Sequence, residues 1–227
     1  MLTPSEHWRS FFIANGFDQA QIRVNKNGIK IPENIPPNQY NGKQVRFGFV
    51  AGNEKVKGFL QIKAAFEEIA SNKWELVIVD HLSHINRQTN IKIAGKGKVK
   101  IIPKFVSENA NSFYDAIDVL LFPTQYPESF GLTVREALIR NKWVIASATG
   151  GVEDAVFEGV NGTLIPLSPD YTFLKKAVEQ ILSNPDKLNG FINPESHKIR
   201  GVSEQADELW EILHEVKSKT NPVCDRQ

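Results

Sequence analysis

The sequence predicts an α/β protein built on a doubly wound, Rossmann-like parallel sheet. From residue 45 onward, short apolar runs typical of buried strands alternate with segments whose apolar residues recur at helical spacing. Turn residues such as Asn161 and Gly162 separate these runs. Strands that alternate with helices form a parallel sheet with helices on both faces. In such sheets, ligands bind beyond the carboxyl ends of the strands, where the strand order reverses.

The apolar patterns place each element of this sheet. We expect strands at residues 45–50, 74–79, 99–102, 118–122, 143–146 and 163–165. We expect helices at residues 59–69, 107–116, 130–140, 171–182 and 203–217, and one helical turn at 152–157. Residues 80–97 are ambiguous, with a short helical pattern around residues 84–89.

The chain also divides into segments. Ser5 is a good helix N-cap and Gly16 suits a helix stop, which predicts a helix between them. Residues 32–42 are rich in proline and asparagine, a composition typical of a linker. We therefore expect a leading segment with a linker (1–43), a main domain (44–190) and a C-terminal helix with a tail (191–227).

Composition narrows the class of protein. Of the 227 residues, 41% are hydrophobic and 23% charged, which fits a globular protein with a core. A formal net charge of +1 gives no support to nucleic acid as a partner. The single cysteine, Cys224, cannot form an internal disulfide, and the first residues lack a signal-peptide pattern. We expect a cytoplasmic protein, and peripheral attachment to a membrane stays open.

The most informative stretch runs from Asp118 to Gly151. An apolar strand ends in a proline-rich loop that delivers Glu128, and a helix after Gly131 carries Glu136, eight residues further on. A carboxylate can accept hydrogen bonds from two hydroxyl groups, such as those of a sugar or a ribose. The alternative to a ligand site is that Glu128 caps a helix and Glu136 lies on a solvated helix face. The Phe-Gly pair between the acids and the strand before them favour a ligand site.

Two glycine-containing turns lie at the same predicted edge. The turn after the first strand holds Gly52 and Lys57 directly before a helix, a setting that suits phosphate. Its spacing matches neither the dinucleotide-binding nor the Walker pattern, and a solvated turn is the more common explanation. Gly150 and Gly151 follow the fifth strand and permit close approach of backbone, to a ligand or within a tight turn.

Other patterns are weaker. Phe105 follows the third strand and could bracket a nucleobase, although a buried structural phenylalanine is the more common case. His81 and His84 could ligate a metal, but no cysteine or further histidine supports them and no Asp-x-Asp occurs, so we predict no metal. The sequence contains no Gly-x-Ser-x-Gly, so a hydrolase of that kind lacks support.

Taken in order, these pieces resemble the C-terminal, nucleotide-sugar-binding half of a GT-B fold glycosyltransferase, and within that fold the retaining family 4 group. Residues 128–137 look like the family's E-x7-E signature. The other matching segments are residues 118–123 (the preceding strand), 150–162 (the Gly-Gly segment), 27–29 (the Asn-Gly of the crossover between domains) and 57–58 (the Lys-Gly after the first strand).

The resemblance implies a role for each residue. Glu128 would bond hydroxyls of the donor sugar at the reaction centre, Glu136 would hold the ribose, and Lys57 would neutralise the diphosphate. The sugar and the diphosphate would contact the backbone amides of Phe130, Gly131, Leu132 and Thr133. Backbone near residues 104–105 would contact the base. The donor is a nucleotide-sugar, and the family needs no metal or other cofactor.

The sequence departs from the family at two places. Gly52 occupies a donor-site position that usually carries arginine, and residues 80–83 replace a Gly-x-Gly-Pro motif. The chain has room for one of the two GT-B domains, so we expect the acceptor to bind a missing N-terminal domain or a partner chain. Two alternatives stay open: a non-catalytic interaction module, and half of a nucleotide-sugar epimerase.

Overall fold

The computed structural model describes residues 1–80, 91–105 and 109–220. The helical pattern at residues 84–89, the histidines His81 and His84, the cap Ser107 and the cysteine Cys224 lie outside these ranges. The departure from the family at residues 80–83 also falls there, apart from its first residue.

The main sheet has six parallel strands, and the predicted fold class is confirmed. Their order across the sheet is β5-β4-β3-β6-β7-β8, so the chain builds outward in one direction from β3 and then in the other from β6. The strands are β3 (Val45–Phe49), β4 (Trp74–Asp80), β5 (Lys98–Pro103), β6 (Val119–Phe122), β7 (Trp143–Ser147) and β8 (Gly162–Ile165). The strand order reverses between β3 and β6, which is where such folds bind ligands.

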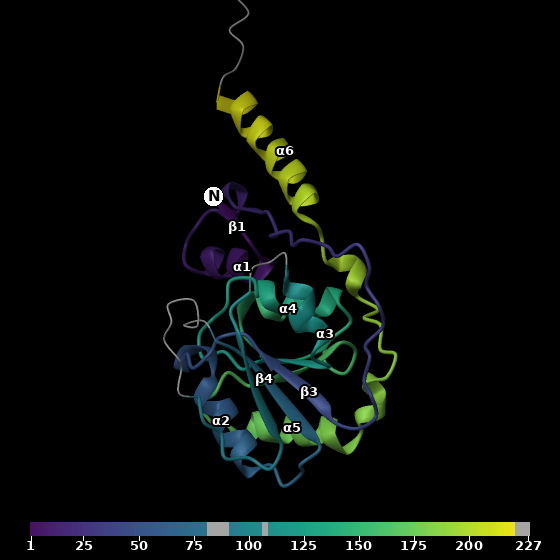
Figure 1. Ribbon diagram of the computed structural model, residues 1–227. Coiled ribbons are helices and arrows are strands. Elements are labelled where there is room, and N and C mark those ends of the chain that lie inside the picture. Colours follow the sequence, from purple (N-terminus) through teal and green to yellow (C-terminus); the bar gives the residue numbers. More distant parts are fainter. Residues whose placement is uncertain (81–90, 106–108, 221–227) are drawn as a thin grey trace, which may run out of the picture.

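Helices cover both faces of this sheet (Figure 1). On one face, α2 (Phe59–Glu68) and α5 (Thr172–Ser183) bury side chains such as Phe66 and Val178 in one core cluster with Phe47. On the other, α3 (Ala110–Asp115) and α4 (Leu132–Ile139) bury Phe113 and Leu138. Neighbouring strand residues alternate between the two clusters, because successive side chains of a strand point to opposite faces.

The observed bounds differ from the expected ones by a few residues, and local geometry gives the reason for the start of α4. Helix α4 begins at Leu132 because Gly131, with φ +78°, adopts a left-handed conformation that a helix cannot contain. Strand β6 begins at Val119, and the carboxylate of Asp118 directly before it binds Arg46, whose Nη2 lies 2.5 Å from its Oδ1. Residues 150–157 form a short 3₁₀ turn, η5 (Gly150–Val152), followed by turns rather than a helix.

The proline-rich segment before β3 is attached to the sheet. Asn38 is buried; its side chain donates a hydrogen bond to the carbonyl oxygen of Asp118, and its backbone bonds to Phe191 and Gly190. The side chain of Asn141 also donates to the carbonyl oxygen of Pro36.

The N-terminal segment is bonded to the last helix of the chain, above the main sheet in Figure 1. The N-terminal residues form α1 (Glu6–Ala14), the 3₁₀ turn η1 (Gln19–Gln21) and a parallel pair, β1 (Leu2–Thr3) and β2 (Arg23–Val24). Asn25 bonds to Glu208 of the last helix, α6 (Val202–Thr220), and Gly28 to Gln205. Helix α6 then extends away from the body of the molecule (Figure 1). Among the described residues, no helix is long and apolar enough to cross a membrane.

Candidate functional site

A cavity of about 190 Å³ lies at the reversal point of the sheet. Its floor comes from the carboxyl ends of β3 and β6, and its walls come from the loop after β6, the first turn of α4 and the turn before α2. The residues that line it are Asn27, Phe49, Val50, Ala51, Lys57, Leu121, Phe122, Glu128, Ser129, Phe130, Gly131, Leu132 and Thr133.

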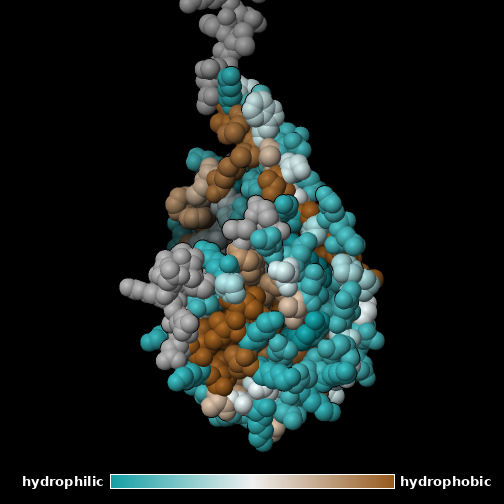
Figure 2. All heavy atoms as spheres, in the orientation of Figure 1, coloured by the Kyte–Doolittle hydropathy of each residue, from teal (hydrophilic) through white to brown (hydrophobic). Residues whose placement is uncertain are grey.

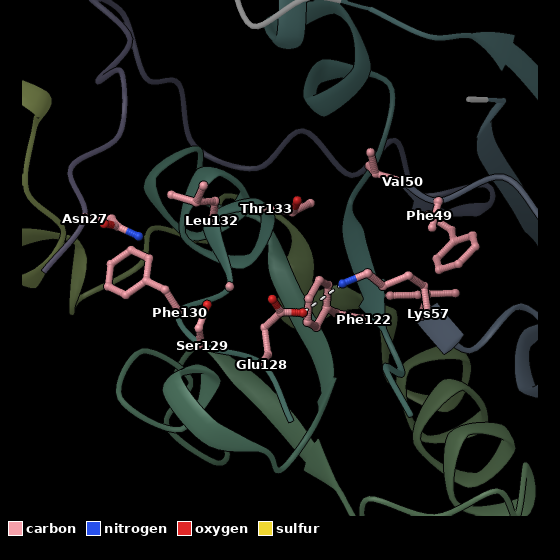
Figure 3. A pocket seen from close by; sticks show the side chains of 13 residues that line it. Asn27, Phe49, Val50, Lys57, Phe122, Glu128, Ser129, Phe130, Leu132 and Thr133 are labelled. Carbon is pink, nitrogen blue, oxygen red and sulfur yellow. Dashed lines mark hydrogen bonds and ion pairs between the residues drawn. The ribbon is translucent and has the colours of Figure 1, made fainter. Parts of the chain in front are cut away.

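Lys57 and Glu128 face each other across this cavity (Figure 3). The Nζ of Lys57 lies 3.0 Å from Oε2 of Glu128, and both side chains are partly exposed. Lys57 belongs to the 3₁₀ turn η2 (Lys55–Lys57), which Gly58 joins to α2. Gly58 has φ +91°, and a Cβ there would lie 2.0 Å from the carbonyl oxygen of Pro123. Only glycine therefore allows this turn to pack against the end of β6, which brings Lys57 to the cavity.

The N-terminus of α4 opens onto the same cavity. Leu132 and Thr133, its first two residues, line the cavity together with Gly131. The first N–H groups of a helix have no partner within the helix and carry a partial positive charge. This end of α4 therefore offers hydrogen-bond donors that suit an anionic group, beside the charged amine of Lys57.

The loop that carries Glu128 is held by hydrogen bonds to its carbonyl groups. The backbone N–H of Gly151 and the indole Nε1 of Trp8 donate to the carbonyl oxygen of Glu128, at 2.9 and 3.3 Å. The hydroxyl of Ser5 donates to the carbonyl oxygen of Ser129 at 2.9 Å. Because these donors come from two distant parts of the chain, the N-terminal segment and the loop after β7, the tertiary fold fixes the loop.

Arg135 completes this support from inside the protein. It is buried, and its guanidinium donates to the carbonyl oxygens of Phe130 and Gly151 while lying 3.5 Å from the ring centroid of Phe130. Burial lowers the pKa of Arg135 to about 10, and the negative charge of Asp154 opposes the shift. The side chain therefore stays charged at neutral pH and joins the Glu128 loop to the glycine turn after β7.

Glu136 lies outside the lining of the cavity. It is one helical turn beyond Thr133, so the two residues share a face of α4. Its Oε2 accepts a hydrogen bond of 2.9 Å from the hydroxyl of Tyr114 in α3. Glu136 is partly exposed, so one end of its carboxylate is held while the residue stays accessible beside the cavity.

The paired glycines act within the protein fold. A Cβ on Gly150 would lie 2.1 Å from the carbonyl oxygen of Glu128, and one on Gly151 would lie 2.4 Å from that of Ser129. These two positions permit close approach of backbone, as the sequence suggests, but the backbone that approaches is that of the Glu128 loop. They lie directly behind the cavity, and their contact with a ligand stays a prediction.

Two predicted donor residues do not line this cavity, and their contact with a donor stays a prediction. Gly52 has φ +57° and follows Ala51, which lines the cavity, but Gly52 does not. Phe105 lies in another hollow, on the α3 side of β5, and stacks on Phe113 with ring centroids 5.4 Å apart. The structure therefore groups Lys57, Glu128 and residues 130–133 in one cavity, with Glu136 at its margin, and leaves Phe105 apart.

Several residues of this region are not predicted by the sequence. Asn27 lines the cavity from the N-terminal segment, and Phe122 lines it near Lys57, whose Nζ is 5.9 Å from the centroid of the Phe122 ring. Ser5 and Trp8 carry no local signal for this role, because it depends on contacts more than a hundred residues away. Arg135 has one weak signal: the helix positions one turn away from it, Leu132, Leu138 and Ile139, are apolar.

These groups together suit a ligand with two different parts. A cation and helix N–H donors favour an anionic part such as a phosphate. A carboxylate on the opposite wall favours a part that presents hydroxyl groups. Because the supporting loop is already held by buried contacts, the site is organised to bind such a ligand with little rearrangement.

Comparison with known proteins shows the family and the fold of this chain. Residues 30–196 match the family model described as glycosyl transferases group 1. Over 106 residues, or 47% of this chain, the sequence is 32% identical to the D-inositol 3-phosphate glycosyltransferase of Corynebacterium diphtheriae. That segment spans 23% of the relative's length.

Solved structures show the same fold at low identity. The sucrose-phosphate synthase of Thermosynechococcus elongatus aligns over 96% of this chain with a TM-score of 0.77 and 19% identity. The Anabaena protein Alr3699/HepE, solved in complex with UDP-glucose, aligns over 94% with a TM-score of 0.74 and 18% identity. The chain spans 58% and 63% of those two proteins, and its sheet is the Rossmann-like half of the GT-B fold predicted from the sequence. With about three quarters of its length inside the family model, the chain belongs to the glycosyl transferases group 1 family.

Proposed function

We propose that this chain is the donor-binding half of a retaining, metal-independent glycosyltransferase of the family 4 type. The observation that carries the proposal is the pairing of Lys57 with Glu128 across a cavity that also receives the N-terminus of α4. In this assignment, Lys57 and the α4 N–H groups bind the diphosphate of a nucleotide-sugar. Glu128 bonds hydroxyls of the sugar, and Glu136 bonds those of the ribose.

The chemical work of this half is to stabilise the departing diphosphate. As the bond to the sugar breaks, negative charge grows on the diphosphate, and fixed donors aimed at it lower the barrier. Lys57 and the first turn of α4 supply such donors. The retaining outcome rests on the resemblance of residues 128–137 to the E-x7-E signature, and it is tested by the anomeric configuration of the product. Activity that persists in excess chelator tests the proposed independence from metal and other cofactors.

Donor binding is tested by calorimetry with UDP, GDP, ADP and their sugar conjugates. UDP-glucose is the first donor to try, because the similar Anabaena protein was solved with it. We expect binding by the wild-type chain and a loss of about tenfold or more for Lys57→Ala, since a charge-assisted contact to phosphate disappears. The matched control is Lys175→Ala, which removes a lysine paired with Glu68 between α5 and α2, where neither residue lines the cavity. A folded wild-type chain that binds none of these ligands at millimolar concentration overturns the proposal.

We infer that the acceptor is held by a second domain, in the same polypeptide or in a partner chain. The chain spans about 60% of the solved glycosyltransferases to which it is similar. Hydrophobic side chains also gather along α6 and at the adjoining N-terminal segment (Figure 2). Among them, Trp210 is 66% and Phe17 51% exposed. A surface of this kind is typical of an interface with another domain.

We also propose that the reaction takes place in the cytoplasm, with or without peripheral attachment of the protein to a membrane.

A second candidate function is a non-catalytic module that docks on another protein. Gly52 favours it, because the family's usual arginine is missing beside the proposed diphosphate site. Glu128→Ala separates the two functions when it is introduced into the complete assembly. Loss of transfer supports the donor-binding half, whereas unchanged activity supports the module.

A further inference from the structure

Tyr114 stands out among the residues to which no function has been assigned. It lies in α3, away in sequence from the Glu128 loop, and its side chain is fully buried. Its hydroxyl, at the edge of this buried position, donates a 2.9 Å hydrogen bond to Oε2 of Glu136 and lies 3.4 Å from the carbonyl oxygen of Thr133. Tyr114 thus reaches the wall of the cavity and the carboxylate beside it.

The surroundings of Tyr114 keep this hydroxyl in place. Its ring packs edge-on against Phe113, with centroids 5.1 Å apart, and the guanidinium of Arg140 lies 4.7 Å from its ring centroid. Arg140 is itself held, because it donates to the side chain of Asn111 and to the carbonyl oxygen of Glu136. Burial, followed by the charge of Glu136, raises the pKa of Tyr114 well above its ordinary value, so the phenol remains a hydrogen-bond donor.

We propose that Tyr114 is a positioning residue that orients Glu136 toward the ribose hydroxyls of the bound nucleotide. The proposal rests on the donor-binding function proposed above. A glutamate on a helix surface has a flexible side chain, and ordering it on binding costs free energy. A buried, rigid donor that already holds Oε2 removes most of that cost and leaves the other carboxylate oxygen to accept from a hydroxyl.

This role differs from simple packing in one measurable respect. If Tyr114 acts through Glu136, its hydroxyl matters most for ligands that carry both ribose hydroxyls. If Tyr114 only fills the core, its loss weakens all nucleotides by the same factor. The ratio of affinities for UDP and 2′-deoxy-UDP therefore reports the positioning role and is insensitive to a general loss of stability.

The test compares wild type with Tyr114→Phe, which keeps the ring and its contacts and removes only the hydroxyl. We expect wild type to prefer UDP over 2′-deoxy-UDP by about tenfold, and Tyr114→Phe to reduce that preference to about two- to threefold. Glu136→Gln should abolish most of the preference, and the double variant should add little more, because the two residues act as one unit.

The chain offers a matched control. Tyr171→Phe removes a hydroxyl that donates to Oε1 of Glu68 at 2.6 Å, the same type of contact on the opposite face of the sheet. This variant should keep the wild-type preference, and thermal unfolding of each variant shows that it is folded.

The outcomes separate this inference from the proposed function. An unchanged preference in Tyr114→Phe overturns the positioning role and leaves donor binding intact. If wild type binds UDP and 2′-deoxy-UDP equally, Glu136 does not bind the ribose. That result overturns the inference and leaves the proposed donor binding intact. Wild type that binds no nucleotide overturns both.

Discussion

At the scale of single residues, Lys57 and Glu128 are bound to each other. A ligand therefore has to replace Glu128 as the partner of Lys57, and Lys57 as the partner of Glu128. Within the cavity, Nζ of Lys57 lies 3.0 Å from Oε2 of Glu128, and the two side chains are 38% and 22% exposed, respectively. A pair this open to solvent contributes about 0–1 kcal/mol. A diphosphate, with more charge and several acceptor oxygens, can therefore replace Glu128 as the partner of Lys57 at small cost.

This competition predicts opposite effects of Glu128→Gln on two ligands. Affinity for UDP should stay unchanged or rise up to about fivefold, because Lys57 is released from its partner. Affinity for UDP-glucose should fall about tenfold, since the sugar loses a charged acceptor. Calorimetry with both ligands measures the difference.

The control for this prediction is Glu67→Gln, which breaks the Lys63–Glu67 pair within α2, away from the cavity. It should change neither affinity. Equal weakening of UDP and UDP-glucose by Glu128→Gln would show that Glu128 acts on the structure of the site and not on the sugar.

At the scale of elements, the loop that carries Glu128 depends on the turn after β7. Gly150 and Gly151 pass so close to the carbonyl groups of Glu128 and Ser129 that no Cβ fits between them. Arg135 of α4 bonds to both segments. The carboxyl ends of β6 and β7 are neighbours in the sheet, so these two loops form one unit around the first turn of α4.

This unit predicts that Gly150→Ala affects both stability and binding. The new Cβ would meet the carbonyl oxygen of Glu128 at 2.1 Å, at a position with φ +58°. We expect a loss of about 2–4 kcal/mol in the free energy of unfolding, together with weaker binding of UDP-glucose as the loop moves.

Gly159→Ala provides the control, because Gly159 has φ +75° but no heavy atom within 4 Å of the place that a Cβ would take. It should cost about 1 kcal/mol from backbone strain alone and leave binding unchanged. Urea unfolding and calorimetry measure the two effects. Equal losses in the two variants would contradict the contact between Gly150 and the loop.

At the scale of the whole molecule, the cavity that holds Lys57 and Glu128 and the exposed hydrophobic surface are joined through the N-terminal segment. Helix α1 connects them, because Ser5 and Trp8 bond to the Glu128 loop while Phe11 is 47% exposed. The parallel pair β1–β2 has only two strands, although parallel strands are usually found in larger sheets covered on both faces. A second domain seated here would lie next to the donor sugar, where an acceptor has to enter.

This arrangement predicts that the chain alone binds nucleotide-sugar but transfers no sugar. Radiolabelled donor, incubated with the chain and sugar-containing acceptors, should give no labelled product. A mixture of the chain with the proposed second domain should transfer sugar, and Glu128→Ala in the chain should abolish that transfer. Transfer by the chain alone, lost again in Glu128→Ala, would contradict the need for a second domain.

Much of the fold follows from local pattern. The alternation of buried strands and amphipathic helices predicts the parallel sheet, and a parallel sheet of this kind predicts a ligand site at the carboxyl ends of its strands. The sequence predicts Ser5 as a helix cap, and it is the N-cap of α1. Its second role, as a donor to Ser129, depends on a contact that no local pattern encodes.

The sequence by itself determined the parallel sheet, the positions of the carboxylates Glu128 and Glu136 in the loop and the helix after one strand, and the position of Lys57 directly before a helix. These features are local, because strand and helix periodicity and the turn residues act over a few positions. Only the tertiary structure decided that Lys57 meets Glu128, that Glu136 is held by Tyr114, and that Phe105 lies outside the cavity they form. Those outcomes depend on how separate elements pack, which is fixed by the cooperative burial of the whole core.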